Sequence, residues 1–306
     1  AFAKLEQTQT GDTISSKAEP IVYKKIKYPQ AALNFAIEPQ TKNDEDKIGH
    51  ALMRISEEDP TFSFERNPET RQLIISGLGN VQLQIVLDKL ANTYGVKTNT
   101  IPLRIAYRET IRGKSDVQGR HKKQSGGAGQ FGDVFIRFEP IEEGFEFAEE
   151  VFGGAVPKNY FPAVEKGLQE SMEKGVLAGY PVTGIKATLY DGSYHPVDSN
   201  EMAFKIAASL AFKKGIEAAQ PIILEPVMQI VVNIPESYMG DVMGDINKKR
   251  GRILGMNPQE DGSQEIVAEA PYSELVEYAI DLRSMTQGRG SFTSEFARYE
   301  EVPAMY

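Results

Sequence analysis

The sequence predicts an α+β protein in which two copies of one β-α-β-β-α-β unit flank a different central domain. Three observations support this prediction. The chain has 306 residues, which is more than one hydrophobic core usually serves. The same order of apolar patterns occurs towards both ends of the chain, and a basic, Gly-rich segment lies between the two occurrences. Hydrophobic residues make up 41% of the chain and charged residues 25%, as is ordinary for a globular protein.

The first unit begins with a short apolar run at residues 33–37, which predicts a strand. Thr41 and Asp44 then form a capping-box signature, so a helix is expected to begin there. Its apolar residues recur at helical spacing: Ile48, Ala51, Leu52 and Ile55. The remaining expected elements are a hairpin over 61–66 and 72–76 with a turn at 67–70, a helix over 79–94 ended by Gly95, and a strand over 96–100.

The second unit repeats this order near the end of the chain. Its expected elements are a strand at 228–234, a helix at 237–249, strands at 252–256 and 265–270, a helix at 273–286 and a strand at 292–299. Two such units in one chain predict two ferredoxin-like domains.

The central domain is expected to have its own fold. Val134, Ile136 and Phe138 alternate with Asp133, Phe135 and Arg137 and predict a strand. Helices are expected at 162–174 and 200–218 and a strand at 185–190; the second helix carries Met202, Ile206, Ser209, Leu210 and Ile216. The predicted division is 1–26, the end of a preceding domain, then 27–104, 105–224 and 225–306.

Composition excludes several classes of function. The chain has no cysteine, so it has neither disulfides nor thiolate chemistry, which fits a reducing cytosol. It has no apolar run of about 18 residues and no signal-peptide pattern at its start. Its three histidines are far apart and lack ligand spacing, so no metal site is expected. It also lacks a Walker motif, so the chain alone is not expected to be a GTP-binding enzyme.

Charge is unevenly distributed. The net charge is −9, yet residues 104–123 contain seven Lys or Arg and only two acids, whereas residues 139–150 contain six Glu. A basic strip on an acidic body indicates one docking surface for a polyanion; the alternative is a solvated strip.

A Gly-rich loop follows the basic strip. Residues 127–132 match GxGxxG, but the residues after them alternate as a strand, whereas a dinucleotide site requires a helix there. We therefore expect a hairpin loop whose cations and bare backbone contact RNA, with a solvated hairpin tip as the alternative. The candidate contacts are His121, Lys122, Lys123, Ser125, Gly126, Gly127, Gly129 and Gln130.

A second candidate loop lies at residues 190–200. Its Ser, His and Asp do not predict a hydrolase, because triad members normally come from separated elements and no GxSxG is present. We expect Asp198 or Ser199 to cap the following helix and His195 to be an exposed RNA contact. The candidate contacts in this loop are Gly192, Ser193, Tyr194, His195, Asp198 and Asn200.

A third cluster of cations is predicted near helix ends in the last unit. It consists of Lys248, Lys249, Arg250, Arg252, Arg283 and Arg289. Two interpretations are open: complementarity to the helix dipole together with solubility, or a second RNA contact.

Eight stretches of the chain together resemble the elongation factor G family. They are AIEPQTK at 36–42, EDPTF at 58–62, YRETIR at 107–112, HKKQSGGAGQFG at 121–132, LAGYPV at 177–182, GSYHPVDSNEMAF at 192–204, MGDVMGD at 239–245 and LRSMTQGRG at 282–290. They occur in family order through nearly the whole chain.

The resemblance implies the end of a β-barrel domain at 1–26, ferredoxin-like domains III and V, and a ribosomal-protein-S5-like domain IV at 105–224. It further implies a cytoplasmic, GTP-dependent factor that promotes tRNA–mRNA translocation. The tip of domain IV would enter the decoding site of the small subunit, and domain V would lie near the sarcin-ricin loop and stalk base of the large subunit. GTP and Mg²⁺ would bind to the parent protein outside these residues.

Alternatives and departures accompany this resemblance. A ribosome-recycling or ribosome-protection factor could use the same scaffold, some small-molecule kinases share the S5-like fold, and a free-standing RNA-binding module is a third possibility.

Ala128 stands where the family often has a basic residue or His, and Asn200 where Ser is common. Asn80 and Gln82 replace Glu and His, and the chain ends at Tyr306 where many members continue. These differences indicate a paralogue of the housekeeping factor.

Overall fold

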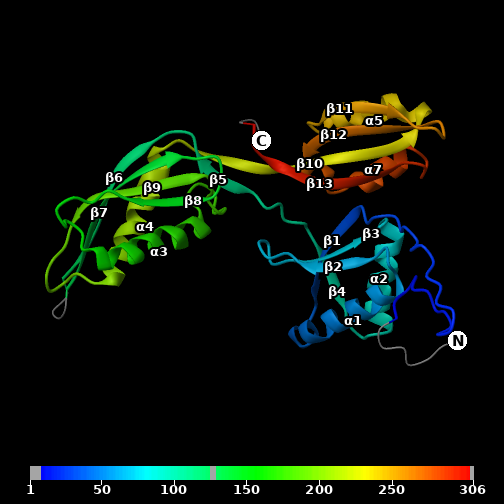
Figure 1. Ribbon diagram of the computed structural model, residues 1–306, viewed down its shortest axis with the longest axis horizontal. Helices are drawn as coiled ribbons and strands as arrows, with labels where there is room; N and C mark the ends of the chain where they lie inside the picture. The colour runs from blue at the N-terminus through cyan, green and yellow to red at the C-terminus, as the bar shows by residue number, and fades with distance from the viewer. Residues whose placement is uncertain (1–7, 125–128, 304–306) are drawn as a thin grey trace. The chain divides into compact units, whose positions relative to one another are not determined.

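The computed structural model describes residues 8–124 and 129–303, and within them the strands form three sheets (Figure 1). The chain divides into two compact units. One unit contains the residues up to Ile105 together with Pro226–Arg298, and the other contains Ala106–Glu225 with the strand end from Tyr299. Residues 8–32 form no helix or strand. Among the described residues, no helix is long and apolar enough to cross a membrane.

The first sheet has the strand order β2-β3-β1-β4. Its elements are β1 (Leu33–Pro39), the 3₁₀ turn η1 (Lys42–Asp44), α1 (Glu45–Glu58), β2 (Ser63–Arg66), β3 (Leu73–Gly77), α2 (Asn80–Asn92) and β4 (Thr98–Ile101). Leu52 on α1, Leu83 on α2 and Ile75 on β3 are fully buried in one apolar core. Burial of such side chains stabilises the unit by roughly 1.5–3 kcal/mol each.

The predicted capping box at the start of this unit is wrong. The Thr41 side chain makes no capping bond to a backbone N–H; its hydroxyl donates instead to Asp44 Oδ2 over 2.7 Å. The chain turns through η1 first, and α1 begins only at Glu45. The Thr41 hydroxyl is thus directed at the Asp44 carboxylate and not at a backbone N–H of the first turn.

Gln82 ties the start of α2 to the turn that follows α1. Its amide donates to Asp59 Oδ2 and to Thr61 Oγ1, both over 2.7 Å, while its oxygen accepts the Leu78 N–H over 2.6 Å. Gln82, which stands where the family usually has His, therefore has a structural role: its amide nitrogen donates and its amide oxygen accepts.

The second repeat has the strand order β11-β12-β10-β13, the same connectivity as the first. Its elements are β10 (Pro221–Pro235), η3 (Glu236–Tyr238), α5 (Met239–Lys248), β11 (Arg252–Pro258), β12 (Ser263–Pro271), α6 (Tyr272–Leu275), α7 (Tyr278–Met285) and β13 (Ser291–Glu301). The predicted pair of β-α-β-β-α-β units is confirmed. The helix predicted at 273–286 is interrupted, because the chain leaves helical geometry at Glu277 (φ −106°, ψ 8°).

The middle domain is a sheet covered on one face by two helices (Figure 1). Its strand order is β6-β7-β9-β8, and β8 and β9 are parallel. The elements are β5 (Arg108–Ile111), β6 (Ser115–Lys123), β7 (Gln130–Pro140), β8 (Phe145–Glu149), η2 (Lys158–Tyr160), α3 (Phe161–Lys174), β9 (Ile185–Ser193) and α4 (Glu201–Ala218). β5 stands apart from this sheet and pairs with the first residues of β10.

Helix α4 lies unusually close to the sheet. A methyl group added at Gly119 would lie 2.1 Å from the Ala207 carbonyl oxygen, and one added at Gly132 would lie 2.5 Å from that of Ala203. The helix therefore buries small residues against the strands, whereas Met202 is 56% exposed and Leu210 39%. Of the larger residues that the sequence analysis named on this helix, Ile216 is buried, and Phe204 and Phe212 are buried with it.

Glu109 on β5 binds the loop that follows α3 in this domain. Its side chain is fully buried and accepts four backbone N–H bonds of 2.7–3.1 Å, from Val176, Leu177, Ala178 and Tyr180. Burial opposes ionisation, but the four donors outweigh it and lower the pKa of Glu109 below its ordinary value. One carboxylate thereby fixes the loop that follows α3.

Candidate nucleic-acid interface

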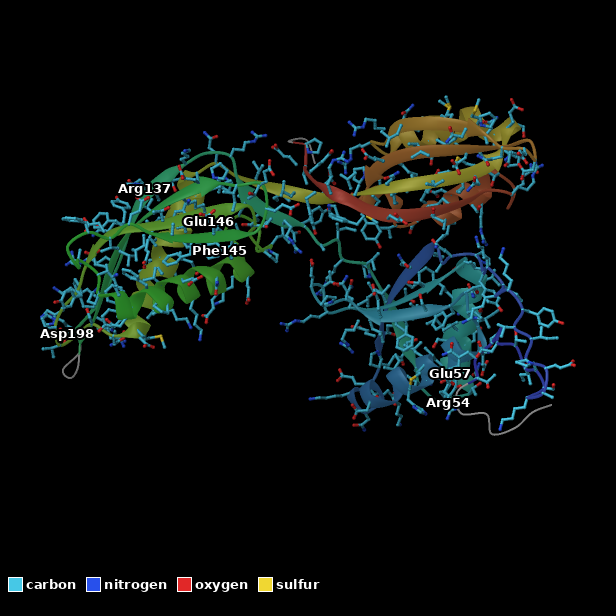
Figure 2. The ribbon with its side chains drawn as sticks, viewed as in Figure 1. Arg54, Glu57, Arg137, Phe145, Glu146 and Asp198 are labelled. Atoms are coloured by element: carbon cyan, nitrogen blue, oxygen red, sulfur yellow. The ribbon has the colours of Figure 1, made fainter. Side chains whose placement is uncertain are left out.

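Two of the predicted contact segments meet at one end of the middle domain. The hairpin of β6 and β7 closes at this end, with Lys123 opposite Gln130. β9 pairs with β7 and runs towards the same end, so the segment 194–200 leaves the sheet beside the hairpin. Figure 2 labels Asp198 at this extreme of the domain, far from Phe145 at the start of β8. Ser125, Gly126 and Gly127 lie outside the described residues.

A short bridge joins the two segments. The Phe131 N–H donates to the Asp198 carbonyl over 2.9 Å, and the Ser199 hydroxyl donates to the Phe131 carbonyl over 2.8 Å. Phe131 and Ser199 also form an isolated parallel β-bridge. We call the group His121, Gln130, Phe131, His195, Asp198 and Ser199 the tip cluster.

His195 is exposed, but its ring orientation is fixed. Its Nδ1 accepts the backbone N–H groups of Val197 and Asp198 over 3.3 and 3.1 Å. The Asp198 carboxylate lies 3.5 Å from the same nitrogen, which is longer than either of those bonds. Since Nδ1 is an acceptor, the neutral ring carries its hydrogen on Nε2 and can donate it to a partner.

Gln130 and its neighbour Gly129 each contact another residue of the tip cluster. His121 Nε2 donates to Gln130 Oε1 over 2.8 Å, which leaves the amide NH₂ of Gln130 as a donor. A methyl group at Gly129 would lie 2.6 Å from the Asp198 side chain, so a larger residue here would require the Asp198 carboxylate to move. Arg120 lies over the Phe131 ring at 5.4 Å from its centroid.

Some cations of the basic strip at residues 104–123 are neutralised by acidic partners in the fold. Arg112 forms an ion pair with Glu301, and Lys114 pairs with Glu139 over 2.5 Å. Lys122 and Lys123 are exposed, and neither has an ion pair among the described residues. Within the strip, Lys122 and Lys123 beside the tip cluster therefore remain available to a polyanion, as does exposed Arg104 at its other end.

Three residues of the second predicted segment have structural roles. The Ser193 hydroxyl donates to buried Asp133 over 2.7 Å, and a methyl at Gly192 would lie 2.3 Å from the Asp133 carbonyl oxygen. The cap of α4 is Asn200, whose side-chain oxygen accepts the Ala203 N–H over 2.9 Å. The prediction that Asp198 or Ser199 caps this helix is wrong, because the bridge to Phe131 uses the Asp198 carbonyl and the Ser199 hydroxyl. Tyr194 is 48% exposed.

Sequence reasoning missed a third segment at this end of the domain. The Tyr160 hydroxyl donates to the Ser199 carbonyl over 3.1 Å, and buried Val156 contacts the backbone at Gly192. Between β8 and these contacts, Phe152 is 93% exposed beside Gly153 and Gly154, which have φ of 66° and 72°. The adjacent glycines were the available signal, because positive φ favours glycine.

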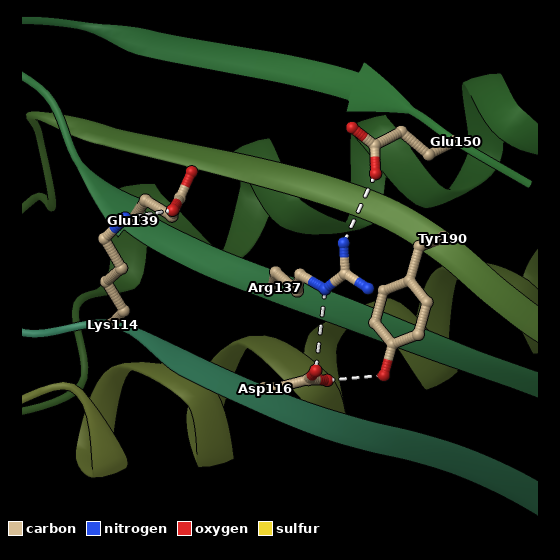
Figure 3. A network of polar contacts seen from close by, with 6 residues as sticks. All are labelled: Lys114, Asp116, Arg137, Glu139, Glu150 and Tyr190. Atoms are coloured by element: carbon tan, nitrogen blue, oxygen red, sulfur yellow. Dashed lines mark hydrogen bonds and ion pairs between the residues drawn. The ribbon is translucent and has the colours of Figure 1, made fainter.

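The sheet face opposite the helices is charged but internally paired (Figure 3). The Arg137 guanidinium lies 4.0 Å from the Tyr190 ring centroid and pairs with Asp116 and Glu150 over 3.6 and 3.3 Å. The Tyr190 hydroxyl donates to Asp116 over 2.6 Å, which raises the pKa of Tyr190 to about 12. These groups satisfy one another, so this face contributes little free positive charge.

The third predicted cluster is also mostly paired. Lys249 forms an ion pair with Asp281 over 2.8 Å, Arg250 with Glu274 over 3.2 Å and Arg252 with Glu269 over 2.6 Å. Arg289 bonds to the Tyr238 hydroxyl and lies 4.9 Å from that ring's centroid, and Arg283 lies against Gly79. Lys248 has no ion pair in the described part of the chain. RNA contact by this cluster stays a prediction.

The middle domain does not fit a nucleotide at its Gly-rich loop. Gly129 leads directly into β7, which begins at Gln130, so a strand follows the loop where a dinucleotide site requires a helix, and the Asp198 carboxylate lies against Gly129. A phosphate there would meet a negative charge. Within residues 8–124 and 129–303, no three His, Asp or Glu side chains converge on a metal site.

Three family models match the chain in order. They are Elongation Factor G, domain III, over residues 28–102; Elongation factor G, domain IV, over 103–220; and Elongation factor G C-terminus, over 222–306. A crystal structure of a Thermus thermophilus protein is 41% identical with a TM-score of 0.81, and the match covers 99% of this chain and 46% of that chain. The chain thus spans just under half the length of this relative.

The two repeats and the domain between them define a chain of the translation elongation factor class. Within that class, the chain belongs to the elongation factor G family.

Proposed function

We propose that this chain is the ribosome-binding part of a GTP-dependent translocation factor, and that its tip cluster enters the decoding site of the small subunit. The observation that carries the proposal is the tip cluster itself. Bridged backbone segments hold an oriented His195 and Gln130 beside two exposed lysines without acidic partners among the described residues. A codon–anticodon duplex offers the complementary groups, namely phosphates, 2′-hydroxyls and base edges.

Each side chain has a distinct part in this proposal. Lys122 and Lys123 neutralise phosphates, which provides affinity without reading sequence. His195 Nε2–H and the Gln130 amide donate to sugar or base acceptors of the duplex. Because both groups are already oriented by protein hydrogen bonds, little ordering entropy is lost when RNA binds.

The second repeat is proposed to contact the large subunit near the sarcin-ricin loop and stalk base. Lys248 at the end of α5 is the cation of the third cluster best placed for this, since Lys249 and Arg250 are occupied by acids. The complete protein is proposed to act in the cytoplasm and to use GTP and Mg²⁺ bound outside these residues. The role of this chain would be mechanical rather than enzymatic.

Ribosome binding by the complete protein at several salt concentrations tests the proposal. Lys122→Ala with Lys123→Ala is expected to weaken binding and to reduce the log–log salt slope by roughly 0.7 to 0.9 for each phosphate that is no longer neutralised. The matched control is Lys174→Ala with Lys213→Ala, which removes two exposed lysines from the C-terminal halves of α3 and α4, away from the tip cluster. An unchanged slope in the first variant, or an equal change in the control, would assign Lys122 and Lys123 to an ordinary solvated surface.

Translocation is distinguished from recycling and from ribosome protection by following tRNA movement and subunit splitting in the same preparation. His195→Ala is expected to slow tRNA movement by roughly 5- to 150-fold, the effect of removing one hydrogen bond or one stacking interaction from the transition state. His195→Gln keeps a polar group and is expected to recover part of that rate. Splitting activity without tRNA movement would favour a recycling factor instead.

A further inference from the structure

Ser199 makes four hydrogen bonds within and beside the tip cluster. Its hydroxyl accepts the His195 N–H and donates to the Phe131 carbonyl, both over 2.8 Å. Its own N–H donates to the His195 carbonyl over 3.0 Å, and its carbonyl accepts the Tyr160 hydroxyl over 3.1 Å. These four bonds join β7, the His195 loop and the segment before α3.

We propose that Ser199 is a positioning residue that holds His195 in its contact orientation, an inference that rests on the proposed function. The bonds from the Ser199 hydroxyl and N–H to His195 close the loop 195–199 into a ring. That ring places the N–H groups of Val197 and Asp198 against His195 Nδ1. The orientation of the imidazole therefore depends on ring closure, and closure depends on Ser199.

The hydroxyl is suited to this task because it donates and accepts at once. Alanine removes both bonds and leaves the His195 N–H and the Phe131 carbonyl without their partner. Threonine retains a hydroxyl with the same two capacities. Neighbouring residues do not replace it, because Asn200 caps α4 and the Asp198 side chain lies against Gly129.

Ser199 itself need not touch RNA, which separates this role from that of His195. A residue that acts only through another gives a rate effect that disappears when its target is removed. Ser199→Ala in the complete protein is expected to slow tRNA movement about 3- to 30-fold, as the loss of one to two net hydrogen bonds implies. In the His195→Ala background the same change is expected to have no further effect.

The experiment combines this double-mutant cycle with amide hydrogen exchange. Ser199→Ala should speed exchange at the His195 N–H, and Ser199→Thr should restore both the exchange rate and tRNA movement. Ser171→Ala is the matched control, because its hydroxyl also bonds a backbone carbonyl, at 2.7 Å, but lies between α3 and α4. Unchanged protection of the amides in β7 and β9 shows that the domain remains folded.

The outcomes separate this inference from the proposed function. If His195→Ala does not slow tRNA movement, the proposed contact fails, and exchange at the His195 N–H alone then decides whether Ser199 holds the loop. If His195→Ala slows movement but Ser199→Ala leaves His195 exchange unchanged, positioning by Ser199 is wrong. Rate effects that multiply in the double variant would likewise overturn it, because Ser199 would then act independently of His195.

Discussion

The Glu109 carboxylate offers a quantitative test of how the middle domain is held together. Glu109→Gln keeps one acceptor oxygen and turns the other position into an NH₂ group, which faces N–H donors. Two of the four backbone N–H groups then lose their acceptor. Each unsatisfied buried donor costs about 1–3 kcal/mol, so the variant is expected to lose about 2–6 kcal/mol of the domain's free energy of unfolding.

The effect should depend on pH with a defined sign. The pKa of Glu109 is lower in the folded protein than its ordinary value of 4.5. Its contribution is therefore complete above about pH 4.5 and is lost as the pH falls through the folded-state pKa. The difference between the wild-type chain and Glu109→Gln should be largest near pH 7 and shrink in acid, because glutamine does not titrate.

Local probes are needed because a multidomain chain does not unfold in one step. Urea unfolding at pH 7 should be followed through amide exchange at Val176, Leu177, Ala178 and Tyr180. Glu143→Gln, which changes an exposed carboxylate in the same domain, is the control. If Glu109→Gln left the exchange of these amides and the urea midpoint unchanged, the four bonds would not stabilise the loop.

Substitutions at three other positions have expected outcomes that thermal or urea unfolding with local probes can check. Asn200→Ala should destabilise the start of α4 by about 1 kcal/mol through loss of its cap, and Asn200→Ser should retain most of it. Glu269 pairs with Arg298 and Arg252, and these partners lower the pKa of Glu269 to about 2. Glu269→Gln should therefore destabilise the second repeat at pH 7, by an amount that falls as the pH drops from 4.5 towards 2; a pH-independent loss would contradict this. Gly49→Ala should stabilise α1 by about 0.5–1 kcal/mol, since nothing lies within 4 Å of the added methyl, and a loss of stability would mean that the site is strained.

The repeated fold was predictable because its apolar spacing is local information. Ile48, Leu52 and Ile55 recur at helical intervals, and the structure buries all three. The break at Glu277 was not predictable in this way, because helical periodicity continues across it. The capping box failed for a related reason: Thr41 and Asp44 have the right spacing, but spacing does not reveal that their side chains bond to each other.

The candidate site was predictable as two segments but not as one structure. His195, Gln130 and the two lysines stand out by residue type, whereas the Phe131–Ser199 bridge arises only when β7 and β9 pair. The sequence also does not reveal which Lys and Arg side chains form ion pairs in the fold. Lys114 and Lys249 look as available as Lys122 in the sequence, yet Glu139 and Asp281 pair with them in the fold.

The close contact between α4 and its sheet has a consequence for divergence. Ala207 and Ala211 approach Gly119 so tightly that larger side chains on either surface would force the layers apart. Selection is therefore expected to hold these small residues nearly constant. The side chains of Lys122, Tyr194 and His195 are exposed, so close packing does not restrict their size in this way. The side chains at the tip are therefore expected to differ more among related chains than the small residues that pack α4 against the sheet.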